Sequence, residues 1–206
     1  MYALVEDNNI TQIITNPKTM VIGDVRYPAK IFQLWSQSEL NAIGIYEVIT
    51  DSSNFKDEKW YINTNESYAF ADNQVTRSWG TATPKAHADS LWTQEDSDDG
   101  DLPDDKEVGD VKVEGLKTQL IRTLKSQVAG ILSNTDWYIT RNTEKSTAIP
   151  SAISTHRDAV RTKQAEMETA ITNASDTPAL ETLYTYTTDD DGVQSRPLGE
   201  LPTLEI

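Results

Sequence analysis

The spacing of apolar residues changes once along the chain, near residue 113, and this change restricts the folds available to it. Before that point, short apolar segments such as 3–6 and 10–14 are separated by turn-forming residues, a pattern typical of strands and hairpins. After it, apolar residues recur every three or four positions, as they do on one face of a helix. The sequence therefore predicts an α+β fold in which strands come first and helices follow.

Four parts are expected along the chain, with boundaries at the changes in period and charge. Residues 1–87 are expected to form a small, mostly-β N-terminal module with one short helix. Residues 88–112 are expected to be an acidic linker, and residues 113–175 an αα-hairpin. Residues 176–206 complete the chain with a short helical turn and an extended acidic tail.

Turn and capping signals define the elements of the first part. Three hairpins are expected, each formed by two segments on either side of turn-forming residues: 3–6 with 10–14, 20–22 with 25–27, and 67–70 with 74–79. Ser36 and Glu39 have the spacing of a capping box, in which each residue satisfies a backbone donor of the other. Gly44 is suited to the left-handed conformation that ends a helix. A short helix is therefore expected between Ser36 and Gly44.

Aromatic residues are frequent in this first part, and we expect them to provide much of its core. Nine are involved: Tyr27, Phe32, Trp35, Tyr46, Trp60, Tyr61, Tyr68, Phe70 and Trp79. The functional alternative is a receptor-binding or glycan-binding surface, formed by Trp60, Tyr61, Tyr68 and Trp79.

The formal net charge of −15 is unevenly distributed. Residues 88–112 hold ten acidic residues against two lysines and few apolar residues, so we expect this segment to be solvated. A calcium loop starting at Asp96 would place Gly100 at position 5, and one starting at Glu95 would place Lys106 at position 12, so neither matches an EF-hand. Because an acidic protein repels phosphate backbones and anionic lipid, we expect no nucleic-acid or membrane partner.

Motifs that carry known chemistry are not found in the sequence. It has no phosphate-binding glycine loop, no Gly-x-Ser-x-Gly and no His-Glu-x-x-His. The chain has no cysteine, and its two histidines, His87 and His156, do not stand in a nucleophile or metal-ligand context. No apolar run reaches the about 20 residues that span a bilayer, and the first residues do not resemble a signal peptide. We therefore expect no enzymatic activity, no cofactor, no metal and no membrane span.

Two amphipathic helices are expected in the third part. The first carries an apolar stripe: Val113, Leu116, Leu120, Ile121, Leu124, Val128, Ile131 and Leu132. The second begins near Pro150, a residue favoured in a first helical turn, and has a second apolar face: Ile153, Val160, Met167 and Ile171. These two faces are expected to pack against each other.

The segment that joins the two helices contains several side chains suited to a helical corner. We expect Thr135 to cap the turn that follows it and Asp136 to be favoured by the dipole of a helix start. Trp137 is expected to insert its ring between the two long helices. Arg141 or Arg161 is expected to pair with Asp136. The functional alternative is a partner-binding hot spot formed by Trp137, Tyr138 and Arg141, side chains that would then be exposed.

The order of residues in and after this corner is distinctive. Thr135-Asp136-Trp137 is followed by Arg141, by Ile149-Pro150 and by residues 156–161. This pattern resembles the C-terminal helical hairpin of tail-fibre and tail-assembly-chaperone proteins of tailed bacteriophages, although His156 stands where that group usually has Tyr. Residues 27–48 also resemble modules that precede such a hairpin in proteins of marine phages. Together the two resemblances cover somewhat more than a third of the chain.

The resemblance implies a non-enzymatic structural component of a tailed-phage virion, associated with the tail, baseplate or tail fibre. Such a protein would be found in the virion, and in the host cytoplasm during assembly. Its expected partners are other phage tail or fibre proteins and further copies of itself in a homo-oligomer. The alternative is a tail-fibre or tail assembly chaperone that is absent from the mature particle. Partner binding is expected at Thr135, Asp136, Trp137, Tyr138, Arg141, Pro150, Arg157 and Arg161.

Overall fold

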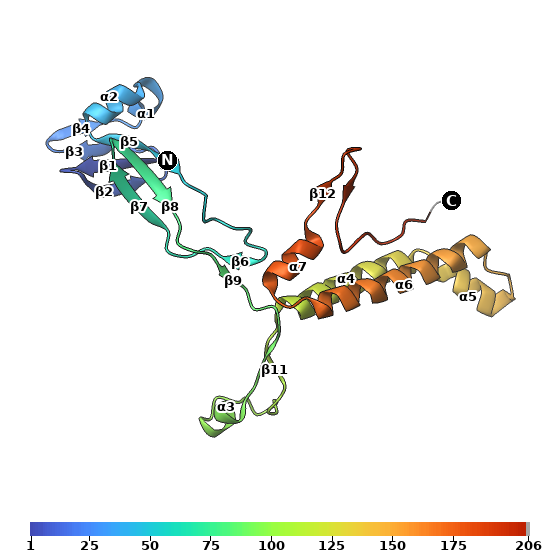
Figure 1. Ribbon diagram of the computed structural model, residues 1–206. Helices are drawn as coiled ribbons and strands as arrows, with labels where there is room; N and C mark the ends of the chain where they lie inside the picture. Colours follow the sequence, from blue (N-terminus) through green and yellow to red (C-terminus); the bar gives the residue numbers. More distant parts are fainter. Residues whose placement is uncertain (205–206) are drawn as a thin grey trace. The chain divides into compact units, whose positions relative to one another are not determined.

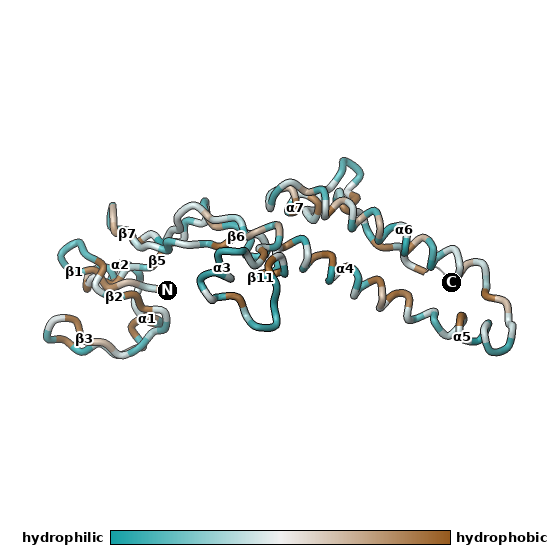
Figure 2. Tube along the Cα trace, turned by 90° about the horizontal axis from the view of Figure 1, so that it is seen from below, coloured by the Kyte–Doolittle hydropathy of each residue, from teal (hydrophilic) through white to brown (hydrophobic). Residues whose placement is uncertain are grey.

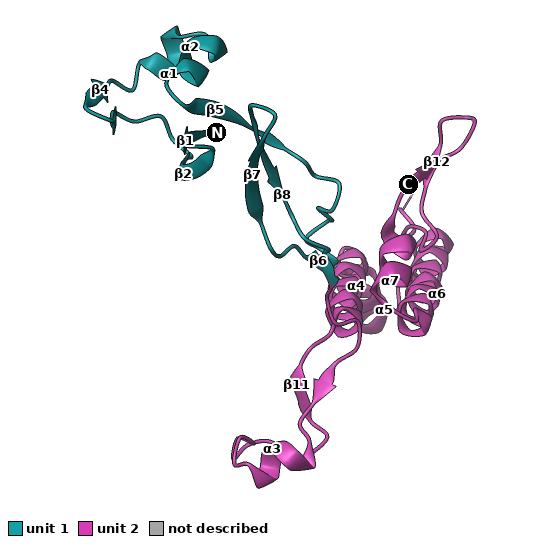
Figure 3. Cartoon of the chain, turned by 60° about the vertical axis from the view of Figure 1, so that its left-hand side comes forward, with its two compact units in different colours: residues 1–83 teal, residues 84–206 magenta. Residues whose placement is uncertain are grey.

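The computed structural model describes residues 1–204 and divides into two compact units (Figure 3), residues 1–83 and the chain from Pro84 onward. Strands predominate in the first unit and helices in the second (Figure 1), so the predicted α+β class is confirmed. The first unit ends four residues before the boundary that we expected at residue 87.

A five-stranded sheet with the order β2-β1-β5-β8-β7 forms the centre of the first unit. Its strands are β1 (Tyr2–Glu6), β2 (Asn9–Ile14), β5 (Ile45–Thr50), β7 (Ser67–Ala71) and β8 (Gln74–Ser78). All neighbours are antiparallel except β5 and β8, which are parallel. The chain between these two strands makes the connection that a parallel pair requires.

Two-residue turns with left-handed backbone close two of the hairpins. Asp7 and Asn8 join β1 to β2, while Asp72 and Asn73 join β7 to β8, and all four have φ between 50° and 62°. Such turns match the twist of the paired strands, and Asn and Asp tolerate them better than most residues. The third hairpin joins β3 (Met20–Ile22) to β4 (Val25–Tyr27). All three predicted hairpins are therefore confirmed.

The predicted capping box is present at the start of α2 (Gln37–Ala42), which follows the single turn α1 (Ile31–Leu34). Oγ of Ser36 accepts a hydrogen bond from the backbone N–H of Glu39, and Oε2 of Glu39 accepts one from the N–H of Ser36 at 2.8 Å. Both bonds are local, which explains why sequence alone located this helix.

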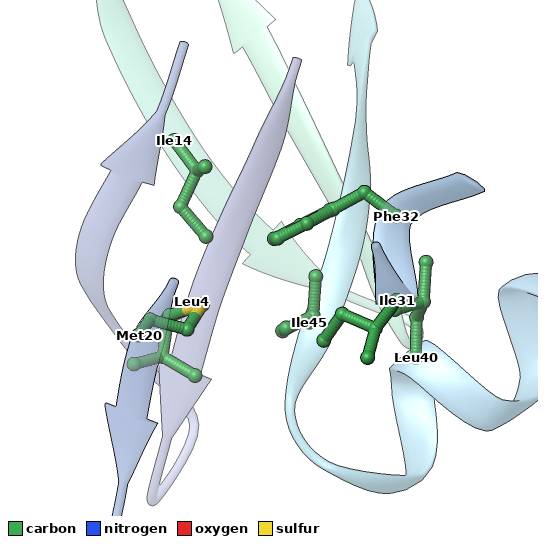
Figure 4. Packing of buried hydrophobic residues seen from close by; sticks show 7 residues of the cluster. All are labelled: Leu4, Ile14, Met20, Ile31, Phe32, Leu40 and Ile45. Atoms are coloured by element: carbon green, nitrogen blue, oxygen red, sulfur yellow. The ribbon is translucent and has the colours of Figure 1, made fainter. Parts of the chain in front are cut away.

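The buried core of the first unit is mainly aliphatic, and six of the nine predicted aromatic residues belong to it or pack against it, so the prediction is confirmed in part. Successive residues of β1 supply two clusters on opposite faces: Leu4 belongs to the cluster shown in Figure 4, while Ala3 and Val5 belong to the other. Of the nine aromatic residues, Phe32, Trp60 and Tyr61 are buried. The other six are partly buried, because a small sheet with short helices encloses aliphatic side chains more readily than large rings.

Two further strands of the first part are short. Tyr61–Ile62 forms β6, and Thr83–Pro84 forms β9 at the boundary between the units. The end of β5, the long segment that follows it and the end of β8 position the side chains of a pocket that is described below.

The acidic segment is folded within the second unit, which differs from the linker that we expected. It contains β10 (Ser90–Leu91), α3 (Gln94–Asp98) and β11 (Val111–Val113), with β10 and β11 paired. It buries no large apolar side chain. Its order must therefore come from polar contacts, which composition alone does not predict.

Three sets of hydrogen bonds explain the order of this acidic arm, residues 88–113. Thr93 and Asp96 form a capping box at the start of α3, and Lys112 of β11 forms an ion pair with Asp96. At the base of the arm, Asp89 accepts hydrogen bonds from the N–H of Gly115 at 2.6 Å and from the hydroxyl of Thr118 at 2.8 Å. The arm is therefore stabilised by the hydrogen bonds that the carboxylates of Asp89 and Asp96 accept, and not by a hydrophobic core of its own.

The helical part of the second unit consists of α4 (Leu116–Ser133), α5 (Asp136–Lys145), α6 (Ser151–Asn173) and α7 (Thr177–Tyr184). Helices α4 and α6 run side by side (Figures 1 and 3), and apolar positions recur along both (Figure 2). Their buried side chains confirm most of the predicted faces: Leu116, Leu124, Val128, Ile153, Val160, Met167 and Ile171.

The sequence-based prediction was wrong about two features of this hairpin. Val113 belongs to strand β11 and is 63% exposed, so α4 begins three residues later than expected. The segment that we treated as a corner contains a separate helix, α5. Seven of its ten residues are polar or charged, so it lacks the apolar stripe by which the two longer helices were recognised.

The end of the chain contains the expected short helix and turn, together with a hairpin that we did not predict. Asp176 caps α7 by accepting a hydrogen bond from the N–H of Ala179 at 2.8 Å. Strands β12 (Thr187–Thr188) and β13 (Gln194–Ser195) then pair across the acidic turn. Leu198, in the segment expected to be an extended surface tail, is buried.

Candidate functional site

A buried arginine joins three helices at the end of the hairpin. Arg157 of α6 is 8% exposed. Its Nη1 donates to the carbonyl of Leu132 at 2.8 Å and to Oγ1 of Thr135 at 2.6 Å, and its Nη2 lies 2.9 Å from Oδ1 of Asp136. The last carbonyls of a helix have no partner within it and carry partial negative charge. Arg157 therefore stabilises the end of α4 while it fixes the start of α5.

Thr135 is buried between these helices, 3% exposed. Its Oγ1 donates to the carbonyl of Leu132 at 3.0 Å and accepts from Arg157. The predicted side-chain cap is therefore wrong, because this hydroxyl accepts no hydrogen bond from the backbone of α5. The expected partners of Asp136 are also wrong: its carboxylate contacts Arg157, while Arg161 lies 3.3 Å from Asp158.

The C-terminal segment lies against the same corner. Residues 201–204, together with Ile131, Asn134, Thr135 and His156, line a pocket of about 260 Å³. His156 is buried against this corner. Apolar residues near the end of the chain could have indicated this contact. They recur with neither a helical nor a strand period, so the sequence does not predict where they pack.

Trp137 lies on the opposite side of α5, where it is 50% exposed. The prediction that its ring is inserted between the two long helices is wrong. Consecutive helical residues are rotated by about 100°, so a helix that turns Asp136 toward Arg157 turns the next residue away. Its ring packs on Tyr138, with centroids 3.7 Å apart.

Arg141, one turn further along α5, stacks on both of these rings. Its Cζ lies 4.8 Å from the Trp137 ring centroid and 5.5 Å from that of Tyr138. Within residues 1–204, Nε of Arg141 is buried without a hydrogen-bond partner. We name Trp137, Tyr138 and Arg141 the aromatic–arginine cluster; these are the three residues of the hot-spot alternative, and α5 places them together.

The two remaining predicted residues are Pro150, just before α6, and Arg161, inside it. Pro150 is exposed and directly precedes α6. Arg161 is exposed one turn beyond Arg157. The eight predicted residues thus separate into a corner around buried Arg157 (with Thr135 and Asp136), the partly exposed aromatic–arginine cluster on α5, and two exposed positions at Pro150 and Arg161.

The predicted aromatic surface of the first unit is not formed as expected. Trp60 and Tyr61 are buried, and lysines stack on both rings: Lys59 on Trp60 and Lys56 on Tyr61, each 4.4 Å from the centroid. Tyr68 and Trp79 are partly buried. A surface that needs the faces of all four rings is therefore excluded.

Comparison with known proteins adds no assignment. A scan against protein-family models, a search of curated proteins and a search of solved structures each find no match to the chain. The part of the chain from residue 1 to 204 contains no group of three or more His, Asp or Glu side chains arranged to hold a metal ion. None of its helices has the length and apolar character needed to cross a membrane.

Proposed function

We propose that the protein is a non-enzymatic structural component of a tailed-phage virion, associated with the tail, baseplate or tail fibre, and that it docks other tail proteins through α5. The observation that carries this proposal is the half-exposed ring of Trp137 in the aromatic–arginine cluster, which lies in the very segment that resembles phage tail and chaperone proteins. In that setting the protein acts in the virion, and in the host cytoplasm during assembly.

The composition of the cluster supports a role in protein binding. Trp, Tyr and Arg are the residues most enriched where binding energy concentrates in protein interfaces. A half-exposed indole has apolar area left to bury, and a ring–guanidinium stack adds attraction that grows when water is excluded. The stack also holds Arg141 in one orientation, so less side-chain entropy is lost when a partner accepts its hydrogen bonds.

The buried corner supports the same role from the other side of α5. Arg157 bonds to Leu132 at the end of α4 and to Thr135 and Asp136 where α5 begins, so two of its three contacts hold the first turn of α5. Trp137 and Tyr138 lie in this turn. A binding group on a rigid element needs less ordering on association than one on a mobile loop.

Mass spectrometry of purified particles tests the location. Stoichiometric presence of the protein in particles supports a structural role. Absence from particles, with expression during infection, would replace this proposal by the chaperone alternative. Retention on host cells by the purified protein alone would favour the receptor-binding alternative.

Site-specific photo-crosslinking in infected cells tests the docking surface. A photoreactive phenylalanine at Tyr138 is expected to crosslink to a tail or fibre protein, or to a second copy of this chain in the expected homo-oligomer. The same group at exposed Lys125 of α4 serves as the control. Equal crosslinking at both positions, or none at Tyr138 in assembled particles, would contradict docking through α5.

A further inference from the structure

A second concave site lies in the first unit, away from the residues singled out by the resemblance. It is a pocket of about 500 Å³ between the end of β5, the segment after it and the end of β8. The lining residues used below are Phe55, Glu66, Arg77 and Trp79. Its volume falls in the range of small-molecule sites, about 300 to 1,000 Å³.

An aromatic pair forms the apolar part of this pocket. The rings of Phe55 and Trp79 meet edge to face, with centroids 4.8 Å apart at 65°. The side-chain amide of Asn54 donates to the carbonyl of Trp79 at 3.1 Å, which ties the two segments together. Phe55 is 40% exposed although it packs on another ring, so ring surface remains for a ligand.

A carboxylate and a guanidinium stand beside these rings. Oε1 of Glu66 accepts hydrogen bonds from the hydroxyl of Tyr68 and from Nε of Arg77 at 2.9 Å. Oε2 of Glu66 accepts none from the described residues. The hydrogen bond from Tyr68, followed by that from Arg77, lowers the pKa of Glu66, so this oxygen is charged at neutral pH.

Arg77 is held in place but keeps donors for a ligand. Its Cζ lies 4.4 Å from the ring centroid of Trp79, and its ion pair with Glu66 uses Nε. A guanidinium carries five N–H donors in a fixed plane. The two Nη groups therefore provide donors next to the acceptor oxygen of Glu66, and both side chains are partly exposed.

We infer that this pocket binds a neutral sugar ring. A pyranose presents an apolar C–H face to an aromatic ring, and its hydroxyls both donate and accept hydrogen bonds, as an adjacent carboxylate and guanidinium require. The ionised carboxylate of Glu66 disfavours anionic ligands, whereas a simple cation would leave the donors of Arg77 unused. The inference does not depend on the proposed role in a virion.

Two-dimensional NMR of the ¹⁵N-labelled full chain tests this inference, with the methyl glycosides of glucose, galactose and mannose as probes. At least one sugar is expected to give saturable shifts at the indole N–H of Trp79 and the amides of Phe55 and Glu66. Single sugars bind through few contacts, so half-saturation is expected on the order of millimolar. No saturable shift for any of the three up to about 50 mM, or shifts confined to other residues, would overturn the inference.

Matched variants separate binding from folding. Phe55→Ala is expected to abolish saturation, and Glu66→Gln, which keeps the shape of the side chain, to weaken binding about tenfold or more. Trp137→Ala, which removes a similarly exposed ring from the other unit, is expected to leave the titration unchanged. Unchanged binding in Glu66→Gln would overturn the assignment even if Phe55→Ala failed to fold.

Discussion

The two sides of α5's first turn serve different purposes, although they are formed by consecutive residues. On one side, Thr135 and Asp136 contact a buried arginine that joins three helices. On the other, Trp137 and Tyr138 stack with Arg141, and the ring of Trp137 is half exposed. Arg157 stabilises the fold because it is buried among acceptors at the end of a neighbouring helix. Arg141 is surrounded by aromatic rings, and this arrangement is the one proposed to bind a partner. Residue type alone does not tell these two roles apart.

Removal of the buried arginine should have the largest effect on this comparison. Arg157→Ala is expected to lower the free energy of unfolding of the helical unit by about 2 to 3 kcal/mol, because two charge-assisted hydrogen bonds, an ion pair and the packing of a buried side chain are lost together. Urea unfolding followed by circular dichroism measures this loss. Arg161→Ala, one turn further along α6 and exposed, should change the same free energy by less than about 0.5 kcal/mol. Equal losses of unfolding free energy in the two variants would show that the buried contacts of Arg157 do not stabilise the helical unit.

Thr135→Val should produce the next largest effect. The substitution preserves shape but removes the hydroxyl that accepts from Arg157 and donates to Leu132. The expected loss of unfolding free energy is about 1 to 2 kcal/mol. Thr140→Val on the exposed part of α5 is the matched control and should cost less than about 0.5 kcal/mol. Thermal unfolding of the two variants side by side measures the difference.

Trp137→Ala should affect binding and leave folding nearly unchanged. Because the ring is half exposed, the expected change in unfolding free energy is below about 1 kcal/mol, whereas truncation of a buried aromatic costs about 3 to 5 kcal/mol. Affinity for the partner identified by crosslinking at Tyr138 should fall tenfold or more. A loss of stability in the larger range, with binding intact, would return Trp137 to the role of a wedge between helices.

Acid should have the smallest effect, confined to the acidic arm. The hydrogen bond from Lys112, followed by those from Thr93, lowers the pKa of Asp96 from 3.8 to about 2. Because the folded arm holds this carboxylate ionised, the contribution of its contacts is complete above about pH 4. It is lost as pH falls from there toward 2.

The amide signal of Thr93, which donates to Asp96 at 2.9 Å, should report this titration by NMR. Its midpoint is expected near pH 2, and Asp96→Asn should remove the transition. A midpoint near pH 4 would mean that the ion pair with Lys112 does not persist in solution.

Local signals explain which parts of the fold were predicted correctly. The capping box of Ser36 and Glu39 spans three residues, and the Asp-Asn turns span two, so their partners are fixed by sequence. The apolar faces of α4 and α6 repeat over several turns and predicted the buried residues in the same way. Val113 was misplaced because an apolar residue just before a helix fits both a strand and the helical period.

Contacts between distant residues explain the errors at the candidate site. Arg157 and Thr135 are separated by 22 positions, so helix packing decided that Arg157, and neither Arg141 nor Arg161, would meet Asp136. The acidic arm was predicted to be a solvated linker because ion pairs such as Lys112 with Asp96 across 16 positions have no sequence pattern. The pocket around Phe55 and Trp79 was missed for the same reason, since it combines side chains from segments about 25 residues apart.

The sequence by itself determined the class of fold, the three hairpins of the first unit and the two long helices. These features depend on local geometry and on periodic burial, which neighbouring residues specify. Only the tertiary structure decided that Trp137 faces outward, that Arg157 is the buried arginine and that α5 presents a surface. The physical reason is that the direction of a side chain depends on how its helix is rotated against others, and that rotation is set by the packing of the whole unit.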